Sequence, residues 1–237
     1  MIKIFLLDKL SKLISFYNNR LKIKTQALSP PDLYYAEVSK NSYDHFKKYF
    51  KDSYIYSEDE SIRRFAISES MKKFSNKDLF LEFGVFKGDS INLFANNLKK
   101  INAEIYGFDA FKGLKDEWVT EEYNPAGTFD LKGIKPKVEN NVKLIHGWVE
   151  DTIKNFLLNN NKKISFVHFD LDTYESTSYV LKLIKNKFQP GTIILFDEFY
   201  GFPNWEKYEY KAFKEEIEEN TYKYIAFGTR QACVQII

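Results

Sequence analysis

The chain has 237 residues, of which 44% are hydrophobic, so it can bury one sizeable core, and a second full domain is not expected. Its 35 basic and 33 acidic residues leave a net charge of +2, which argues against nucleic acid as a partner. The single cysteine, Cys233, cannot form an internal disulfide, and this favours a buried thiol in a reducing, cytoplasmic compartment.

The first 24 residues predict an amphipathic helix. Charged residues at positions 8, 9 and 12 interrupt its apolar run, which is too short to span a membrane and lacks the cleavage site of a secretion signal. We expect this helix to pack on the domain or on a second subunit of a homo-oligomer, or else to lie on a membrane surface. Residues 1–60 are interpreted as a helical extension or lid, and residues 61–237 as the main domain. The apolar side of the helix is formed by Phe5, Leu6, Leu10, Leu13, Ile14 and Tyr17.

From Asp78 onward, apolar runs typical of strands alternate with helical patterns, which predicts an α/β fold with helices on both faces of a parallel sheet. The polar stretch 112–140 is longer than an ordinary connection and predicts a lid. The last two β-rich runs, 222–227 and 232–237, predict an antiparallel hairpin. The other strands are expected near 78–84, 103–109, 141–146, 163–170 and 191–197, and the helices near 90–100, 150–158, 175–187 and 206–220.

The first strand of this domain ends in a loop with two glycines, Gly84 and Gly88, that permit a tight turn and a close approach of a ligand. The second strand ends in Asp109, where nucleotide-binding folds place a carboxylate on the ribose hydroxyls. The loop lacks the three-glycine pattern of dinucleotide-binding proteins. A cofactor with adenosine but no phosphate fits better, and we expect S-adenosyl-L-methionine.

Two later strands also end in carboxylates: Asp170 and Asp172 follow one, and Asp197 and Glu198 follow the next. Because the carboxyl ends of parallel strands meet at one edge of the sheet, these four acids are expected to share a crevice. Oxygen ligands of this kind favour Mg²⁺, with Ca²⁺ or Mn²⁺ as alternatives. The other interpretation is that the acids cap the helices that follow them. His168 shares a strand face with Asp170 and is either a residue of the site or an ordinary core histidine.

Five motifs follow one another along the chain: Glu82-Phe83-Gly84-Val85-Phe86-Lys87-Gly88, Tyr106 to Leu114, Gly147 to Thr152, Asp170 to Thr177 and Phe196 to Phe199. In this order they resemble the macrocin O-methyltransferase family, which belongs to the class I S-adenosylmethionine-dependent methyltransferases. The likeness covers roughly residues 60 to 237. It implies a Rossmann-like, seven-stranded and mostly parallel sheet whose last strand is antiparallel.

The resemblance also implies roles for single residues. Glu82, Gly84 and Gly88 would line the methionine end of the cofactor, Asp109 would hold the ribose, and Gly147 with Trp148 would lie near the adenine. A divalent cation would bind Asp170, Asp197 and Glu198 beside the transferred methyl group. The full set expected to contact the cofactor is Glu82, Gly84, Val85, Phe86, Gly88, Ser90, Asp109, Ala110, Phe111, Gly147, Trp148 and Asp170.

The expected activity is metal-assisted methyl transfer to a hydroxyl of a sugar or glycosylated small molecule, with Asp170, Asp172 and His168 as the catalytic set. Positioning provides much of the rate gain in such an in-line displacement. A cation acidifies the acceptor hydroxyl, and Asp172 or His168 takes the proton. Two alternatives stay open, a nicotinamide-dependent oxidoreductase and a non-catalytic binding module on the same scaffold.

Overall fold

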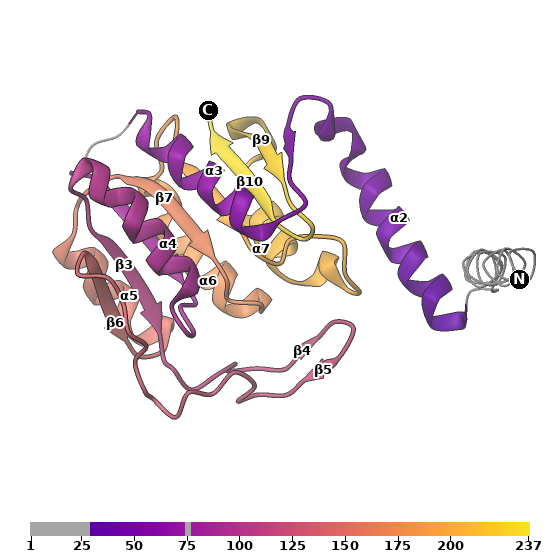
Figure 1. Ribbon diagram of the computed structural model, residues 1–237, viewed down its shortest axis with the longest axis horizontal. Helices are drawn as coiled ribbons and strands as arrows, with labels where there is room; N and C mark the ends of the chain where they lie inside the picture. The colour runs from indigo at the N-terminus through magenta and orange to yellow at the C-terminus, as the bar shows by residue number, and fades with distance from the viewer. Residues whose placement is uncertain (1–28, 74–76) are drawn as a thin grey trace, which may run out of the picture. The chain divides into compact units, whose positions relative to one another are not determined.

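The computed structural model describes residues 29–73 and 77–237 (Figure 1). The amphipathic helix predicted for residues 1–24 lies outside the described residues. The chain divides into two units after Glu37, and only residues 29–37 of the first are described. There the helix α2 (Pro30–Phe50) begins, and the Ser29 hydroxyl donates a hydrogen bond to Asp32 at 2.6 Å. Among the described residues, no helix is long and apolar enough to cross a membrane.

The second unit, Val38–Ile237, is built on one sheet in the order β1-β9-β10-β8-β7-β2-β3-β6. Neighbouring strands are parallel except where β10 pairs with β8 and β9. The α/β class and the terminal antiparallel hairpin are therefore confirmed. A two-residue edge strand, too short to leave a sequence signal, joins the seven expected strands. The bounds are β1 (Tyr54–Ile55), β2 (Leu79–Phe83), β3 (Ile105–Asp109), β6 (Val142–His146), β7 (Ile164–Phe169), β8 (Ile193–Phe196), β9 (Tyr222–Phe227) and β10 (Ala232–Ile236).

Helices cover both faces of the sheet, as the alternation predicted (Figure 1). One face carries α3 (Asp59–Met71) and α4 (Asp89–Leu98), and the other carries α5 (Val149–Asn159), α6 (Tyr174–Ile184) and α7 (Glu209–Glu216). The helix expected near 206–220 is divided between α7 and short 3-10 turns on either side of it. The stretch 112–140 contains a small hairpin that the sequence did not predict, β4 (Trp118–Val119) with β5 (Tyr123–Asn124).

The alternation of side chains along the central strands produces two core layers. Leu81 and Phe83 of β2 belong to the layer under α5, α6 and α7, whereas Phe80 belongs to the layer under α3 and α4. Glu82 therefore points to the α3 and α4 side. It lies directly opposite His168 of β7 in the parallel register, so these two polar residues are neighbours inside that layer.

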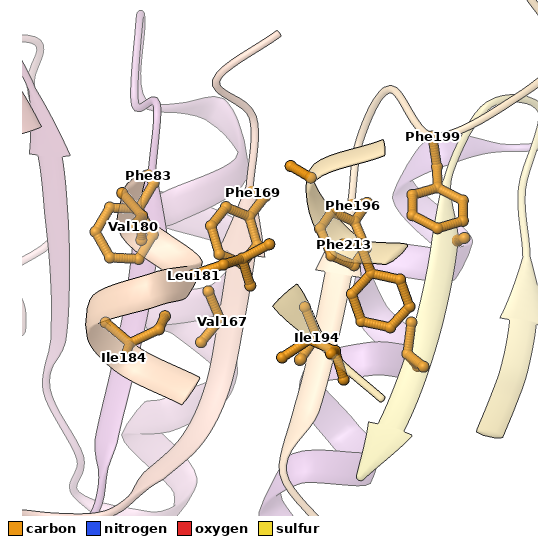
Figure 2. Close-up of a cluster of buried hydrophobic side chains, with 14 of the residues drawn as sticks. Phe83, Val167, Phe169, Val180, Leu181, Ile184, Ile194, Phe196, Phe199 and Phe213 are labelled. Carbon is orange, nitrogen blue, oxygen red and sulfur yellow. The ribbon is translucent and has the colours of Figure 1, made fainter. Parts of the chain in front are cut away.

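The layer under α6 and α7 is filled by aromatic rings from adjacent strands (Figure 2). The ring of Phe169 stacks on Phe83 at 5.5 Å and on Phe196 at 5.2 Å between centroids. Phe213 of α7 packs edge-on against Phe196 at 5.1 Å. The burial of these rings and the aromatic contacts between them stabilise the positions of β2, β7 and β8 relative to one another. The carboxyl ends of these three strands carry the candidate site.

Candidate active site

A cavity of about 280 Å³ opens at the carboxyl ends of β2, β3, β7 and β8. Several residues predicted to contact a cofactor line it, and so do three acids from the ends of β7 and β8. Residues of the stretch 112–140, including Leu114 and Phe129, form part of its wall. The loop predicted as a lid therefore borders the site, although its opening and closing stay a prediction. The predicted residues in the wall are Gly84, Phe86, Asp109, Ala110, Phe111, Trp148, Asp170, Asp172 and Glu198.

The glycine loop requires Gly84 for a steric reason. Its φ is +87°, and a Cβ at this position would lie 1.8 Å from the carbonyl oxygen of Asp170. The end of β7 thus approaches the loop so closely that only glycine fits. Gly88, with φ +88°, precedes the first turn of α4. Together the two glycines hold the loop against the end of β7 and start the helix behind it.

Asp109 binds the glycine loop through backbone hydrogen bonds. Its Oδ2 accepts the N–H of Val85 at 2.8 Å and of Phe86 at 2.7 Å, while Oδ1 accepts the N–H of Phe111 at 2.6 Å. One carboxylate therefore ties together the loops that follow β2 and β3. Asp109 also lines the cavity. Its contact with a ribose stays a prediction, and its role in holding the loops is a structural one that the motif did not reveal.

Several predicted cofactor residues lie behind the cavity wall. Glu82 is fully buried, and its Oε1 accepts a hydrogen bond from the Ser90 hydroxyl at 2.5 Å and contacts Nδ1 of His168 at 2.9 Å. These three residues form a polar group beneath the glycine loop. The cavity lining does not include Glu82, Val85, Gly88, Ser90, Gly147 or His168.

The structure brings the four acids at the ends of β7 and β8 together, and the pKa values reflect their proximity. Burial, Asp197 and Asp172 raise the pKa of Asp170 well above its usual range. Burial and Asp197 raise the pKa of Asp172 to about 7. Burial raises the pKa of Glu198 to about 8, although Arg230 opposes the shift. Burial and mutual repulsion therefore favour the protonated forms of these three acids in the folded protein.

Asp197 differs from the other three acids because cationic groups surround it. Burial would raise the pKa of Asp197, but His168 and Arg63 more than offset that effect and hold it below its usual range. Burial likewise lowers the pKa of His168, yet the carboxylates of Asp197 and Glu82 outweigh it and raise the value to about 9. His168 is thus a buried cation between two carboxylates.

Two arginines that sequence reasoning missed compensate part of the acid cluster. The Arg63 Nη2 lies 2.6 Å from Asp197 Oδ1, and the Arg230 Nη1 lies 3.3 Å from Glu198 Oε2. Arg230 also pairs with Glu121 through Nη2 at 2.6 Å. Guanidinium groups therefore offset part of the repulsion among these acids.

The acids at the ends of β7 and β8 nevertheless form a set of ligands that fits a divalent cation. His168, Asp170 and Asp197 offer ligand atoms that all lie within 4.8 Å of one another, whereas Glu198 does not belong to this group. Both ring nitrogens of His168 already face carboxylates. The oxygens of Asp170 and Asp197 are therefore the ligand atoms that remain available to a cation. Within the described residues the Asp170 carboxylate accepts no hydrogen bond, and carboxylate oxygen is the donor that Mg²⁺ and Ca²⁺ prefer.

A second pocket also borders the acid cluster. It is lined by polar residues of three segments, and it shares Glu198 with the first cavity. One segment leads into α3, one follows β8, and one is the turn between β9 and β10. No strand-end pattern marks the first or the third segment, so residue spacing did not predict this pocket. Its residues are Ser57, Glu58, Asp59, Asp197, Glu198, Thr229, Arg230 and Gln231.

Comparison with known proteins agrees with this architecture. CalS11, a calicheamicin methyltransferase, is 23% identical with a TM-score of 0.60, and the match covers 75% of this chain and 78% of that one. A second structure of CalS11, described as a TDP-rhamnose 3'-O-methyltransferase, has a TM-score of 0.56 at the same identity and coverage. The O-methyltransferase NovP is 17% identical with a TM-score of 0.57, again over 75% and 78% of the two chains. At these identities the likeness establishes a shared fold.

No curated protein sequence matches the chain. The family model described as a methyltransferase domain matches residues 81–199, which contain the glycine loop, Asp109 and the four acids at the ends of β7 and β8. The match spans half of the 237 residues. The chain therefore belongs to the methyltransferase domain family.

Proposed function

We propose that the protein is an S-adenosylmethionine-dependent O-methyltransferase that methylates a hydroxyl of a sugar or glycosylated small molecule with the help of a divalent cation. One observation carries the proposal: a single cavity is lined by the predicted cofactor residues Gly84, Asp109 and Trp148 and by the acids Asp170 and Asp172. A methyl donor at one end would face an acid-lined acceptor site at the other. The activities named for CalS11 and NovP support the choice of a hydroxyl acceptor.

The chain's own residues suit the two tasks of this reaction, which are alignment and proton removal. S-adenosylmethionine would supply the methyl group from its sulfonium. The glycine loop, held by Asp109, and the wall residues Phe108 and Trp118 would restrict its position and exclude water. A cation held by Asp170 and Asp197, with Glu198 nearby, would lower the pKa of the acceptor hydroxyl.

Asp172 is the better candidate for the base. Asp172 lines the cavity, as Asp170 does, and its backbone φ of +61° belongs to the left-handed region, which few residues other than glycine adopt. His168 is fully buried between Glu82 and Asp197 and lines neither pocket, so an acceptor cannot reach its ring. We assign proton removal to Asp172 and a structural place to His168.

The test begins with ligand binding. Calorimetry with the whole protein should show binding of S-adenosylhomocysteine and no binding of NAD or NADP. Incubation with methyl-labelled cofactor and a panel of sugar nucleotides and glycosides should then label an acceptor. Asp172→Asn should lose turnover and keep S-adenosylhomocysteine affinity, whereas Asp151→Asn, an exposed change on α5, should keep both.

Two outcomes separate the parts of the proposal. Full activity in excess chelator would remove the cation and leave the methyl transfer. Cofactor binding without labelling of any acceptor in the panel would favour the non-catalytic binding module. The nicotinamide-dependent alternative has lost its support, because the matching family is one of methyltransferases.

A further inference from the structure

Two hydrogen-bond donors hold one of the two oxygens of Asp197, and a ring nitrogen of His168 lies near the same oxygen. This oxygen, Oδ1, lies 2.6 Å from Nη2 of Arg63 and 3.5 Å from Nε2 of His168, and it accepts a hydrogen bond from the side-chain amide of Gln231. The contact with His168 is long for a hydrogen bond, so Arg63 and Gln231 provide the directed ones. All three groups crowd the same atom.

The other oxygen of Asp197 is left free for a ligand. Within residues 29–73 and 77–237, Oδ2 accepts no hydrogen bond, and Asp197 belongs to the group whose ligand atoms lie within 4.8 Å of one another. A carboxylate can rotate about its last side-chain bond and exchange its two oxygens. Donors fixed on Oδ1 oppose that exchange and keep Oδ2 directed away from them.

We propose that Arg63 and Gln231 are positioning residues that orient Asp197 for a divalent cation. The inference rests on the cation role in the proposed function. Partners of this kind, which bind a metal ligand rather than the metal, commonly set the metal affinity of a site. Arg63 supplies a charged guanidinium donor to an acid, and such hydrogen bonds are stronger than neutral ones.

Both residues lie outside the segment that matches the methyltransferase family. Arg63 belongs to α3, before residue 81, and Gln231 belongs to the turn between β9 and β10, after residue 199. Gln231 is held in place because it is 1% exposed and its carbonyl accepts the N–H of Gly228 at 2.8 Å. The orientation of Asp197 therefore depends on segments at both ends of the domain.

Arg63 could also act only by neutralising Asp197. A variant without the positive charge of Arg63 would change both the orientation of Asp197 and the charge near the site. The loss of that positive charge would by itself favour binding of a metal cation. Charge-conserving variants separate the two effects. Arg63→Lys keeps the charge and loses the planar guanidinium geometry, and Gln231→Met keeps the size and loses the amide.

The experiment measures Mn²⁺ binding to the full chain by electron paramagnetic resonance, in the presence of saturating S-adenosylhomocysteine. Arg63→Lys and Gln231→Met should each weaken Mn²⁺ binding roughly tenfold. S-adenosylhomocysteine affinity and the melting temperature should stay close to those of the wild type. The matched controls are Arg64→Lys, on the same helix but paired with Glu60, and Gln235→Met, further along β10. Both controls should bind Mn²⁺ like the wild type.

The outcomes distinguish the inference from the function on which it rests. If the wild type binds no Mn²⁺, the proposed cation role is wrong, and the positioning role of Arg63 and Gln231 is wrong with it. The proposal of methyl transfer would not be affected by this result. If the wild type binds and both test variants bind equally well, Arg63 and Gln231 do not position Asp197. A parallel loss of Mn²⁺ and S-adenosylhomocysteine affinity would mean a collapsed site, and it would also overturn the positioning role.

Discussion

Glu209 accepts the backbone N–H of Leu171 through Oε1 at 3.2 Å, and this hydrogen bond ties the first residue of α7 to the loop that carries Asp170 and Asp172. The Glu209 side chain is fully buried, and its Oε2 has no hydrogen-bond partner among the described residues. Burial raises the pKa of Glu209 well above its usual range, and Asp172 and Asp170 add to the shift. The folded protein therefore favours the protonated acid at this position.

The first prediction is that Glu209→Gln changes how stability depends on pH. A raised folded-state pKa contributes stability that is fully present below the unfolded pKa of 4.5 and is lost as the pH rises through the folded value. Glutamine imitates the protonated acid at every pH. The free energy of unfolding of the variant, relative to the wild type, should therefore increase between pH 5 and pH 8 in chelator-treated protein. Denaturant titrations at the two pH values measure it.

The control for Glu209 is Glu206→Gln, an exposed change in the 3-10 turn just before α7. Its effect on the free energy of unfolding should be the same at both pH values. A Glu209→Gln variant whose relative stability does not change with pH would show that Glu209 keeps an ordinary pKa in the folded protein.

The second prediction compares glycines with positive φ. Gly84→Ala should destabilise the fold by more than about 3 kcal/mol or prevent folding, because its Cβ would lie 1.8 Å from the Asp170 carbonyl oxygen. Gly133→Ala should cost only about 1–2 kcal/mol, since φ is +74° but no heavy atom lies within 4 Å of its Cβ. Thermal and denaturant unfolding measure both variants. Equal losses would mean that β7 and the glycine loop are further apart than described.

The third prediction concerns Asp109, which accepts three backbone N–H groups from the loops that follow β2 and β3. Asp109→Ala should lower the free energy of unfolding by about 2–3 kcal/mol, because three backbone donors, two of them partly buried, lose their acceptor. It should also weaken S-adenosylhomocysteine binding by tenfold or more, which corresponds to at least about 1.4 kcal/mol. Calorimetry and denaturant unfolding measure the two effects.

Asp130→Ala serves as the control for Asp109. Among the described residues its carboxylate accepts one hydrogen bond, from the N–H of Lys132 at 2.6 Å, in an exposed turn. Neither stability nor cofactor affinity should change by more than about 1 kcal/mol. If Asp109→Ala left S-adenosylhomocysteine affinity intact, Asp109 would have neither the ribose contact nor a role in shaping the cofactor site.

The residues at the strand ends could be predicted from the sequence to lie together, because parallel strands place their last residues at one edge of the sheet. This reasoning located Gly84, Asp109, Asp170 and Glu198 in one cavity. The direction of Glu82 was also readable in principle. Leu81 and Phe83 face one core layer, so Glu82 between them must face the other, away from a ligand at the strand end.

Other parts of the site had no such signal. Arg63 lies on a helix, and the reach of a long side chain to Asp197 depends on how α3 packs against the sheet, which residue spacing does not specify. Gln231 follows a turn whose register is set by the pairing of β9 and β10. The hydrogen bonds of Asp109 depend on the backbone conformation of a loop. Tertiary geometry therefore supplies the residues that surround the acids, whereas the acids themselves follow from strand order.

The last prediction concerns two exposed aromatic residues on the cavity wall, Phe86 of the glycine loop and Phe129 of the stretch 112–140. They are 37% and 43% exposed, and their rings meet nearly edge-on with centroids 5.6 Å apart. A bound cofactor would cover this apolar surface, so Phe129→Ala should weaken S-adenosylhomocysteine binding by about tenfold. Because the ring is already half exposed, the free energy of unfolding should change by less than about 1 kcal/mol. Tyr123→Ala, in the same stretch, 63% exposed and not part of the wall, should change neither quantity. Calorimetry decides the question, since unchanged affinity in Phe129→Ala would mean that the cofactor does not lie under this aromatic pair.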